Sequence, residues 1–579
     1  MKTTRSSFRA FKLSCLRAFV LSYFLLSVNH IFAQDVITFT WQAGYIPKDF
    51  HIQVTYNKTF TVDWGDGSNI ETFTGQNGDY LNITHIYNKA NSFLVTLTAD
   101  TEVCQFLSFV CEYEQIDTLN VSGCTNLYAL YCNSNQLNSL DVSGCTGLQY
   151  LFCYDNQLTS IDVSSNKALI ELGCNNNLLK NLDMSNLTML KVLRIKGNQI
   201  TSINLSKTLE TLDCSVNQLK ILDVKNNKAL KSLQCSNNQL ANLDISNNIV
   251  LQELFCYDNQ LIRLDVSNCK RLKYLFCHNN QLTNLDLSNA TVLEELYCSS
   301  NQLTSLNARG CAKLVYLSCC NNKLSILDIS GCKKLEYLYG YNNQLTYLDV
   351  SSCKVINDLW IYNNRFSLSD LYAVSENINA VDSKLLGNQT LLPQRVAVGY
   401  PLFSDQSVFK GIFTNYTVTK NGSPAPENNY TVTDGKITFN TLGIYTVTMK
   451  NDAIVSNTFY PAEVTVDLMV VDDASIEENG VSTISVYPNP TTGVLNLIQE
   501  RITNYELGIN NEQLTINNIE IFDISGKKCQ MPNLISQTSN HLITSSSNHL
   551  INISHLPAGI YFLKIQTEKD NIIRKIVKQ

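Results

Sequence analysis

The apolar positions in the middle of the chain recur at offsets that neither an amphipathic helix nor an alternating strand produces. From about residue 106 to residue 366 the same pattern returns every 21 residues, and one copy spans residues 127–147. Within this copy Leu127, Leu130 and Leu137 stand at recurring apolar positions. A repeat of this length predicts a stack of coils, because a single copy is too short to bury its apolar face without neighbours.

The pattern L-x-x-L-x-C-x-x-N-x-L in each copy resembles the leucine-rich repeat, in which every coil gives one short strand to a parallel sheet. The recurring Asn has a predicted structural role, because a buried amide satisfies backbone groups of its own coil and the adjacent one. We therefore expect a mainly β fold with a leucine-rich-repeat solenoid of about 13 repeats of 21 residues over 104–380, flanked by β-sandwich domains. The Asn column comprises Asn135, Asn156, Asn177, Asn198, Asn217, Asn238, Asn259, Asn280, Asn301, Asn322, Asn343 and Asn364.

Cysteine follows the same period. Ten cysteines occupy the sixth position of the repeat, where ordinary leucine-rich repeats have Leu: Cys111, Cys132, Cys153, Cys174, Cys214, Cys235, Cys256, Cys277, Cys298 and Cys319. This column, with a second and partial one, resembles the cysteine-ladder branch of the internalin family. A free thiol packs at such a position as a small buried hydrophobe. Disulfides between neighbouring coils are an alternative, since a Cα separation of about 5 Å permits them. A metal site is a third alternative, although the ladder has no C-x-x-C or His-rich spacing.

The N-terminal segment predicts export. Residues 1–33 combine a basic start, an apolar stretch over 18–28 and Ala33 before a cleavage point, as in a signal peptide, with a short membrane anchor as the alternative. Residues 34–102 alternate as strands do and carry a W-G-D-G turn at Trp64 and an H-x-Y motif at His85, which look like a PKD-type β-sandwich. Asp63 and Asp66 in this turn either ligate calcium or only shape the turn.

The C-terminal part contains two further predicted modules. A short helical cap is expected over 366–379, followed by an Ig-like β-sandwich over 381–471 with a hairpin at Asp434-Gly435. After a polar linker (472–484), residues 485–579 carry V-Y-P-N-P-T-T-G, a strand ending D-I-S-G, and L-P-A-G-I-Y-F-L. These motifs resemble the C-terminal sorting domain of type IX secretion substrates. The resemblance implies contact with that secretion machinery and export to the cell surface or the extracellular space.

Charge and motif content argue against several function classes. The formal net charge is -7 and the pI is near 5.6, with Lys and Arg scattered along the sequence, so we expect no nucleic-acid partner. No G-x-S-x-G or H-E-x-x-H motif and no plausible Cys-His pair occurs. We therefore predict a protein that is not an enzyme and that has no cofactor, catalytic residue or metal site. No run after the signal segment approaches the ~20 apolar residues of a spanning helix.

Aromatic residues crowd the outward strand positions of the later repeats. Because strand side chains alternate, residues beside the inward Leu are expected on the concave face of the sheet. The candidate ligand-binding residues there are Phe255, Tyr257, Tyr274, Phe276, Tyr297, Tyr316, Tyr337, Tyr339, Tyr341, Trp360 and Tyr362. Tyr and Trp are enriched at interface hot spots. The alternative is that aromatic residues simply suit strands, but that preference acts equally on every copy and does not explain the clustering.

Together these features predict an exported, non-enzymatic surface protein that mediates protein binding or adhesion through a concave aromatic face. A glycan-binding surface protein is the main alternative, because the same rings can stack on sugars. A structural component of a surface layer is a further one. The ligand is expected to be a protein or a glycan.

Overall fold

The computed structural model describes residues 34–472, apart from 44–46, 379–382 and 458–460, and beyond them the backbone of several strands between 484 and 578. The predicted signal peptide (1–33) and residues 473–483 of the predicted linker lie outside the described residues. The chain divides into two compact units, Met1–Val470 and Val471–Gln579.

The N-terminal part contains an antiparallel sheet in the order β4-β3-β6-β1-β8. Its strands are β1 (Val36–Ala43), β3 (Thr59–Asp63), β4 (Glu71–Thr74), β6 (Asn91–Ala99) and β8 (Ile116–Asn120). The core beneath this sheet is aromatic, and Trp41, Phe50 and Trp64 are fully buried in it with ring centroids 6.0–6.4 Å apart. Burial of so many rings gives this small part a core of its own.

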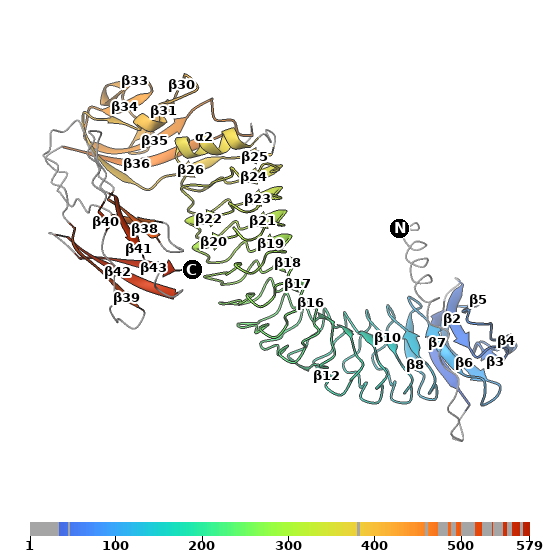
Figure 1. Ribbon diagram of the computed structural model, residues 1–579. Coiled ribbons are helices and arrows are strands. Elements are labelled where there is room, and N and C mark those ends of the chain that lie inside the picture. Colours follow the sequence, from blue (N-terminus) through green and yellow to red (C-terminus); the bar gives the residue numbers. More distant parts are fainter. Residues whose placement is uncertain are drawn as a thin grey trace. The chain divides into compact units, whose positions relative to one another are not determined.

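The strands that face this sheet continue into the solenoid (Figure 1). The strand β2 (Lys48–Val54) pairs antiparallel with both β5 (Leu81–His85) and β7 (Phe106–Val110), and β7 pairs in parallel with the first regular coil. The open edge of a parallel sheet exposes unpaired N–H and C=O groups, so β2 and β5 protect the first edge of the solenoid.

The solenoid sheet is built from strands of three residues, except for the two-residue β25, and runs in the order β9-β10-β11-β13-β15-β16-β17-β18-β19-β21-β23-β24-β25. These strands are β9 (Ala129–Tyr131), β10 (Tyr150–Phe152), β11 (Glu171–Gly173), β13 (Val192–Arg194), β15 (Thr211–Asp213), β16 (Ser232–Gln234), β17 (Glu253–Phe255), β18 (Tyr274–Phe276), β19 (Glu295–Tyr297), β21 (Tyr316–Ser318), β23 (Tyr337–Tyr339), β24 (Asp358–Trp360) and β25 (Lys384–Leu385). Two further, two-stranded parallel sheets join β12 (Asn181–Asp183) to β14 (Ser202–Asn204) and β20 (Ser305–Asn307) to β22 (Ile326–Asp328). The predicted mainly β solenoid of about 13 coils is confirmed.

The Leu and Asn columns explain why the coils stack in register. The central Leu of each strand faces the same residue of the next coil, as Leu254 faces Leu275, and both are fully buried. The side chain of Asn259 accepts from the Leu240 N–H at 2.9 Å and donates to the carbonyls of Cys235 and Cys256 at 3.0 and 3.2 Å. One amide therefore links two coils, and the predicted structural role of the Asn column is confirmed.

The residue before each Asn of the column has a left-handed backbone. Asp155, Asn237 and Asn279 have φ values of 55°, 53° and 52°. Asn and Asp tolerate this region better than other non-glycine residues, which explains their recurrence at this position. Val216 at φ 54° is an exception for which a β-branched side chain is unfavourable.

The ladder cysteines are buried, and all cysteines in the described part of the chain are free. Burial raises the pKa of the Cys235 and Cys256 thiols well above the ordinary value, with a smaller contribution from the neighbouring thiols. The thiolate is the nucleophile and the metal ligand, so these cysteines are held in their unreactive form. This agrees with the interpretation of the column as small core residues.

A helix and small sheets follow the last coil within the first unit. The helix α2 (Leu368–Asn377) begins with a capping box between Ser367 and Asp370, in agreement with the predicted cap. The larger sheet orders β26 (Asn388–Thr390), β36 (Glu463–Val471), β35 (Gly443–Lys450), β31 (Asn415–Lys420) and β32 (Ser423–Pro424), and β27 (Gln394–Ala397) also pairs with β36. A smaller sheet orders β28 (Pro401–Leu402), β34 (Lys436–Phe439) and β33 (Tyr430–Thr433), and β29 (Val408–Phe409) pairs with β30 (Ile412–Phe413).

The predicted hairpin at Asp434-Gly435 is confirmed. It joins β33 to β34 in an antiparallel pair, and Asp434 and Gly435 both have positive φ, at 51° and 71°. Two consecutive positive φ values define the type I′ turn that suits a two-residue hairpin. A Cβ on Gly435 would also lie 2.2 Å from the Ser407 carbonyl oxygen, so glycine is required there.

The second unit consists of two antiparallel sheets in its described strands. One orders β37 (Ile484–Tyr487), β38 (Val494–Gln499), β41 (Asn548–Asn552) and β40 (Ile535–Ser536). The other orders β39 (Ile516–Asp523), β42 (Gly559–Thr567) and β43 (Asn571–Lys578). Two of the three sequence motifs of this region therefore run into strands of the second sheet, β39 and β42.

Candidate functional site

The predicted site residues lie on the outward side of the parallel sheet. Strands β17, β18, β19, β23 and β24 alternate as half-buried, buried and half-buried, with the central Leu inward. Figure 1 shows these strands along the inner side of the bend of the solenoid. All eleven predicted residues are half-buried, and all but Tyr274 pack against a ring of an adjacent coil. The predicted face is thus the one on which the structure places them.

The rings of adjacent coils form one continuous ladder. Ring centroids are 4.7 Å apart for Phe255 and Phe276, 4.2 Å for Phe276 and Tyr297, and 4.4 Å for Tyr297 and Tyr316. Tyr316 then contacts Tyr339 at 5.3 Å. The spacing follows from the strand separation of about 4.8 Å, which falls within the range of about 4.5–7 Å favoured by aromatic pairs.

The ladder ends at Trp360. Its ring lies 4.8 Å from that of Tyr339 and 6.3 Å from that of Tyr341. The indole N–H is buried without a hydrogen-bond acceptor among the described residues. A buried indole N–H normally has a partner, so this donor is an exception within the ladder.

A second, interrupted ladder of two ring pairs runs beside the first, at the residue after the sixth position of the coil, where Tyr257 follows Cys256 and Tyr341 follows Gly340. It pairs Tyr257 with His278 at 4.5 Å and Tyr341 with Tyr362 at 4.6 Å, with ring planes inclined by only 7° in both pairs. His278 belongs to this second ladder but is not among the predicted site residues, which comprise only Phe, Tyr and Trp. Burial lowers the pKa of His278, which favours the neutral ring in the stack.

The tyrosine hydroxyls of the ladder remain protonated at neutral pH. Burial, together with the carboxylate of Asp358, raises the pKa of Tyr339 to about 12. The hydroxyl of Tyr339 donates to Asp358 at 3.2 Å, and that of Tyr274 donates to Glu294 at 3.3 Å. The surface therefore combines apolar ring edges with neutral hydroxyl donors, and carboxylates lie among them.

The aromatic residues of the earliest coils form a separate patch. Tyr131 and Phe152 stack at 5.2 Å, and the hydroxyl of Tyr128 donates to Gln53 of β2 at 2.7 Å. Gly173 ends this patch, since a Cβ there would lie 2.8 Å from the Phe152 ring. These rings contribute to the junction of solenoid and N-terminal part, which distinguishes them from the later ladder.

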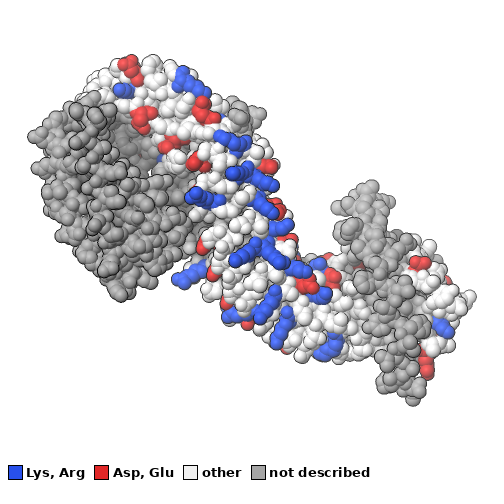
Figure 2. Space-filling model, in the orientation of Figure 1, with Lys and Arg blue, Asp and Glu red and all other residues white. Residues whose placement is uncertain are grey.

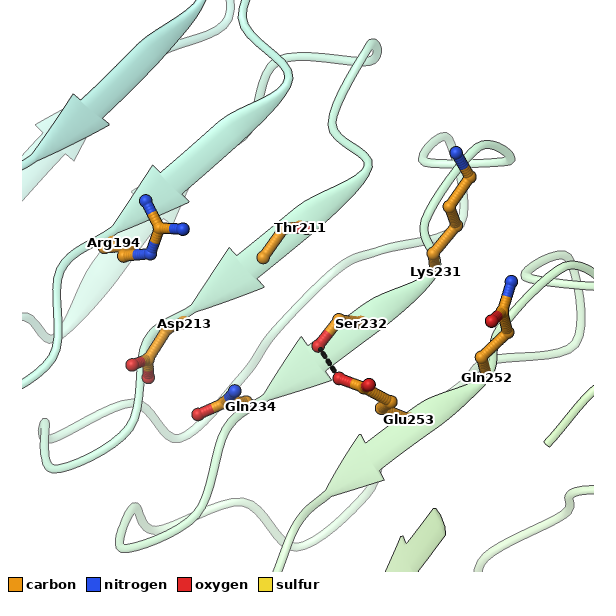
Figure 3. A pocket seen from close by; sticks show the side chains of 8 residues that line it. All are labelled: Arg194, Thr211, Asp213, Lys231, Ser232, Gln234, Gln252 and Glu253. Atoms are coloured by element: carbon orange, nitrogen blue, oxygen red, sulfur yellow. Dashed lines mark hydrogen bonds between the residues drawn. The ribbon is translucent and has the colours of Figure 1, made fainter. Parts of the chain in front are cut away.

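A polar depression of about 360 Å³ separates the two aromatic patches (Figure 3). It is lined by Arg194, Thr211, Asp213, Lys231, Ser232, Gln234, Gln252 and Glu253. Ser232 donates to Glu253 at 2.7 Å, and Arg194 forms an ion pair with Glu171. Two of its four charged residues, Arg194 and Lys231, form ion pairs, and the depression interrupts the aromatic surface with a hydrophilic segment.

The turn at Asp63 and Asp66 in the N-terminal part is closed by its own hydrogen bonds. Asp63 accepts from the Gly65 N–H and Asp66 from the Ser68 N–H, each at 2.9 Å, and Asp66 also contacts His85 at 2.9 Å. Burial opposes ionisation of Asp66, but the bonds from Ser68 and His85 outweigh it and lower its pKa to about 2. These contacts support the interpretation as a turn. The described residues hold no cluster of three or more His, Cys, Asp or Glu side chains suited to a metal ion.

The fold defines the class of the protein: a leucine-rich-repeat solenoid that carries a cysteine ladder. The chain ends in a secretion domain, because residues 485–579 match the family model of the secretion system C-terminal sorting domain. This domain indicates export to the cell surface or the extracellular space, so the chain is a secreted leucine-rich-repeat protein. No helix in the described residues is both long and apolar enough to cross a membrane.

The chain is similar to several solved leucine-rich-repeat structures. The functional domain of InlJ from Listeria monocytogenes, which includes a cysteine ladder, is 28% identical over 63% of this chain and 90% of that chain, with a TM-score of 0.49. The ectodomain of the receptor kinase GASSHO1/SCHENGEN3 from Arabidopsis thaliana is 24% identical over 44% of this chain and 35% of that chain (TM-score 0.39). YopM from Yersinia pestis is 23% identical over 42% and 74%, respectively (TM-score 0.35). Among curated proteins, none matches this chain.

Proposed function

We propose that the protein is a non-enzymatic binding protein of the cell surface that holds a protein partner against the aromatic ladder of its parallel sheet. The observation that carries the proposal is the unbroken chain of half-buried rings from Phe255 to Trp360. Stacked rings are rigid and lose little conformational entropy on binding, and Tyr and Trp dominate interface hot spots.

The stacking favours a protein partner over a glycan. Sugars bind aromatic residues by lying on an exposed ring face. Each ring of the ladder has a neighbouring ring with its centroid 4.2–5.3 Å away, which leaves little free ring face for a sugar. Tyr297 and Tyr316 cover each other with planes inclined by 20°, and the other pairs are tilted by 47–55° or edge-on at 75°. Ring edges and hydroxyl groups suit apolar side chains and backbone carbonyls of a protein.

The test is a binding screen of the secreted chain against surface proteins and against a glycan array. The parent chain and the double variant Tyr297→Ala/Tyr339→Ala are compared with Thr304→Ala/Ser325→Ala, which changes two exposed residues away from the sheet. We expect a protein ligand whose affinity falls at least tenfold in the ring variant only. Binding that is retained by the ring variant, or a ligand found only among glycans, would contradict the proposal.

A further inference from the structure

Each coil in the later half of the solenoid enters the sheet through a pair of tight turns five residues long. These segments are residues 225–229, 246–250, 267–271, 288–292, 309–313, 330–334 and 351–355. None of them contains Asp, Glu or an aromatic residue, whereas five of the seven contain Lys or Arg. We call the following eight exposed cations the basic ridge: Lys228, Lys270, Arg271, Arg309, Lys313, Lys333, Lys334 and Lys354.

The backbone of the ridge is held rigidly. Asn247, Asn268 and Asn289 each donate from the side-chain amide to a carbonyl of the preceding coil at 3.2 Å. Beneath them the buried Asn248 donates to the Asn227 carbonyl at 2.8 Å. Consecutive turns are therefore fixed one strand separation apart, about 4.8 Å, and residues roughly 21 apart in sequence become neighbours.

The cations of the ridge are not neutralised within the described part of the chain. None of the eight lies within 4 Å of a carboxylate there, whereas Lys231 and Lys273, on the sheet side, pair with Glu210 and Glu294. In the same turn region Lys225 pairs with Asp244, so it is left out of the ridge.

The Asp residues that precede these turns are hydrogen-bonded to the turns themselves. Asp265 and Asp286 each accept from a turn N–H at 2.9 Å. In Figure 2 Lys and Arg follow the coils in a row, and many of the Asp and Glu on this face lie to either side of it. The solenoid thus segregates its charges even though the whole chain has a formal net charge of -7.

We propose that the basic ridge is a second binding surface, independent of the aromatic ladder, for a linear polysaccharide that carries carboxylate or sulfate groups. A row of fixed cations, spaced at one or two coils, matches a chain with regularly repeated anions. The Ser and Asn residues of the same turns offer hydrogen bonds to sugar hydroxyls. Single-stranded nucleic acid is disfavoured, because the turns contain no ring on which a base could stack. An exported protein also meets anionic polysaccharides outside the cell.

The test uses the full secreted chain and immobilised heparin as a linear sulfated polysaccharide. The ridge variant combines Lys270→Gln, Arg271→Gln, Lys313→Gln, Lys333→Gln and Lys334→Gln. The matched control has the same change in net charge at five exposed residues outside the ridge: Lys180→Gln, Lys196→Gln, Lys220→Gln, Arg263→Gln and Lys323→Gln. All ten side chains are exposed, so unfolding temperatures should stay close to that of the parent.

We expect the parent to bind heparin with an affinity that falls steeply as salt is raised, since the contacts are ionic. The ridge variant should bind at least tenfold more weakly, which corresponds to about 1.4 kcal/mol, and the control should bind within threefold of the parent. A variant with Lys in place of Arg271, and Arg at the four Lys positions, should restore binding.

Three results would overturn the proposal. The first is a parent chain that does not bind heparin at 50 mM salt. The second is an equal loss in the ridge variant and the control, which would mean that only net charge matters. The third is equally tight binding of single- or double-stranded DNA, which would mean an unselective polyanion surface. Replacing ladder rings should leave heparin binding unchanged, so this proposal and the proposed function fail separately.

Discussion

Removing the Phe276 ring separates the packing role of the aromatic ladder from its binding role. The ring lies between those of Phe255 and Tyr297, with centroids at 4.7 and 4.2 Å, and is half-buried. Each such ring pair contributes about 0.5–1.5 kcal/mol, so Phe276→Ala should lower the free energy of unfolding by about 1–3 kcal/mol. The adjacent Leu275 is fully buried, and Leu275→Ala should cost about 3–5 kcal/mol because it leaves a cavity between coils.

For binding affinity the order of the two variants should be reversed, so that Phe276→Ala has the larger effect and Leu275→Ala the smaller one. Truncation of a hot-spot ring commonly costs about 2 kcal/mol or more, which is roughly a thirtyfold loss of affinity. Phe276→Ala should therefore bind the partner found in the screen much more weakly than Leu275→Ala does. Urea denaturation of the full chain followed by circular dichroism gives the stabilities, and affinities are measured far below both midpoints.

Two outcomes would refute this reasoning. If Phe276→Ala is as destabilised as Leu275→Ala and keeps its affinity, the ring belongs to the core. If it is barely destabilised and still keeps its affinity, the ligand lies elsewhere on the solenoid.

Four further predictions follow from the contacts described above. Asn259→Ala should cost about 1–3 kcal/mol of unfolding free energy, because it leaves the buried Leu240 N–H unpaired and removes one of the two side-chain amides that donate to the Cys235 carbonyl; an equal effect of Gln260→Ala, at an exposed position, would contradict this. The thiols of the cysteine ladder should react with a thiol reagent only after denaturation, as a count of free thiols with and without denaturant will show. Because the pKa of Asp66 is lowered to about 2, its contribution to stability is present above pH 4 and is lost as the pH falls toward 2; the melting temperature of Asp66→Asn should therefore fall less over this range than that of the parent. Deleting residues 485–579 should leave the solenoid folded and keep the protein from reaching the cell surface, which surface labelling of intact cells measures.

Periodicity alone was enough to predict the solenoid. Apolar residues that recur every 21 residues are buried when the coils stack, so that Leu275 packs against Leu254 of the preceding coil. The recurring Asn then forms hydrogen bonds with backbone groups of two coils. The hairpin at Asp434-Gly435 was equally accessible, since its turn type depends on two consecutive residues. These features depend on local or strictly periodic interactions, which the sequence pattern alone specifies.

The boundaries between modules depended on tertiary pairing. The segment around β2 looks like part of a separate sandwich in sequence, yet β2 pairs with β7 and so extends the solenoid sheet. Strand pairing across roughly 55 residues is set by the need to cover a sheet edge, for which no local signal exists.

Only the tertiary structure decided which surfaces the side chains share. Alternation within a strand predicts that Phe276 and Tyr297 point outward, but the contact between their rings follows from the strand separation and from the side-chain rotamers. The stacking of His278 on Tyr257 in the second ladder depends on the same two factors. Lys270 and Lys313 appear scattered along the chain, and they become part of one ridge because the coil converts a sequence spacing of about 21 residues into a step of about 4.8 Å.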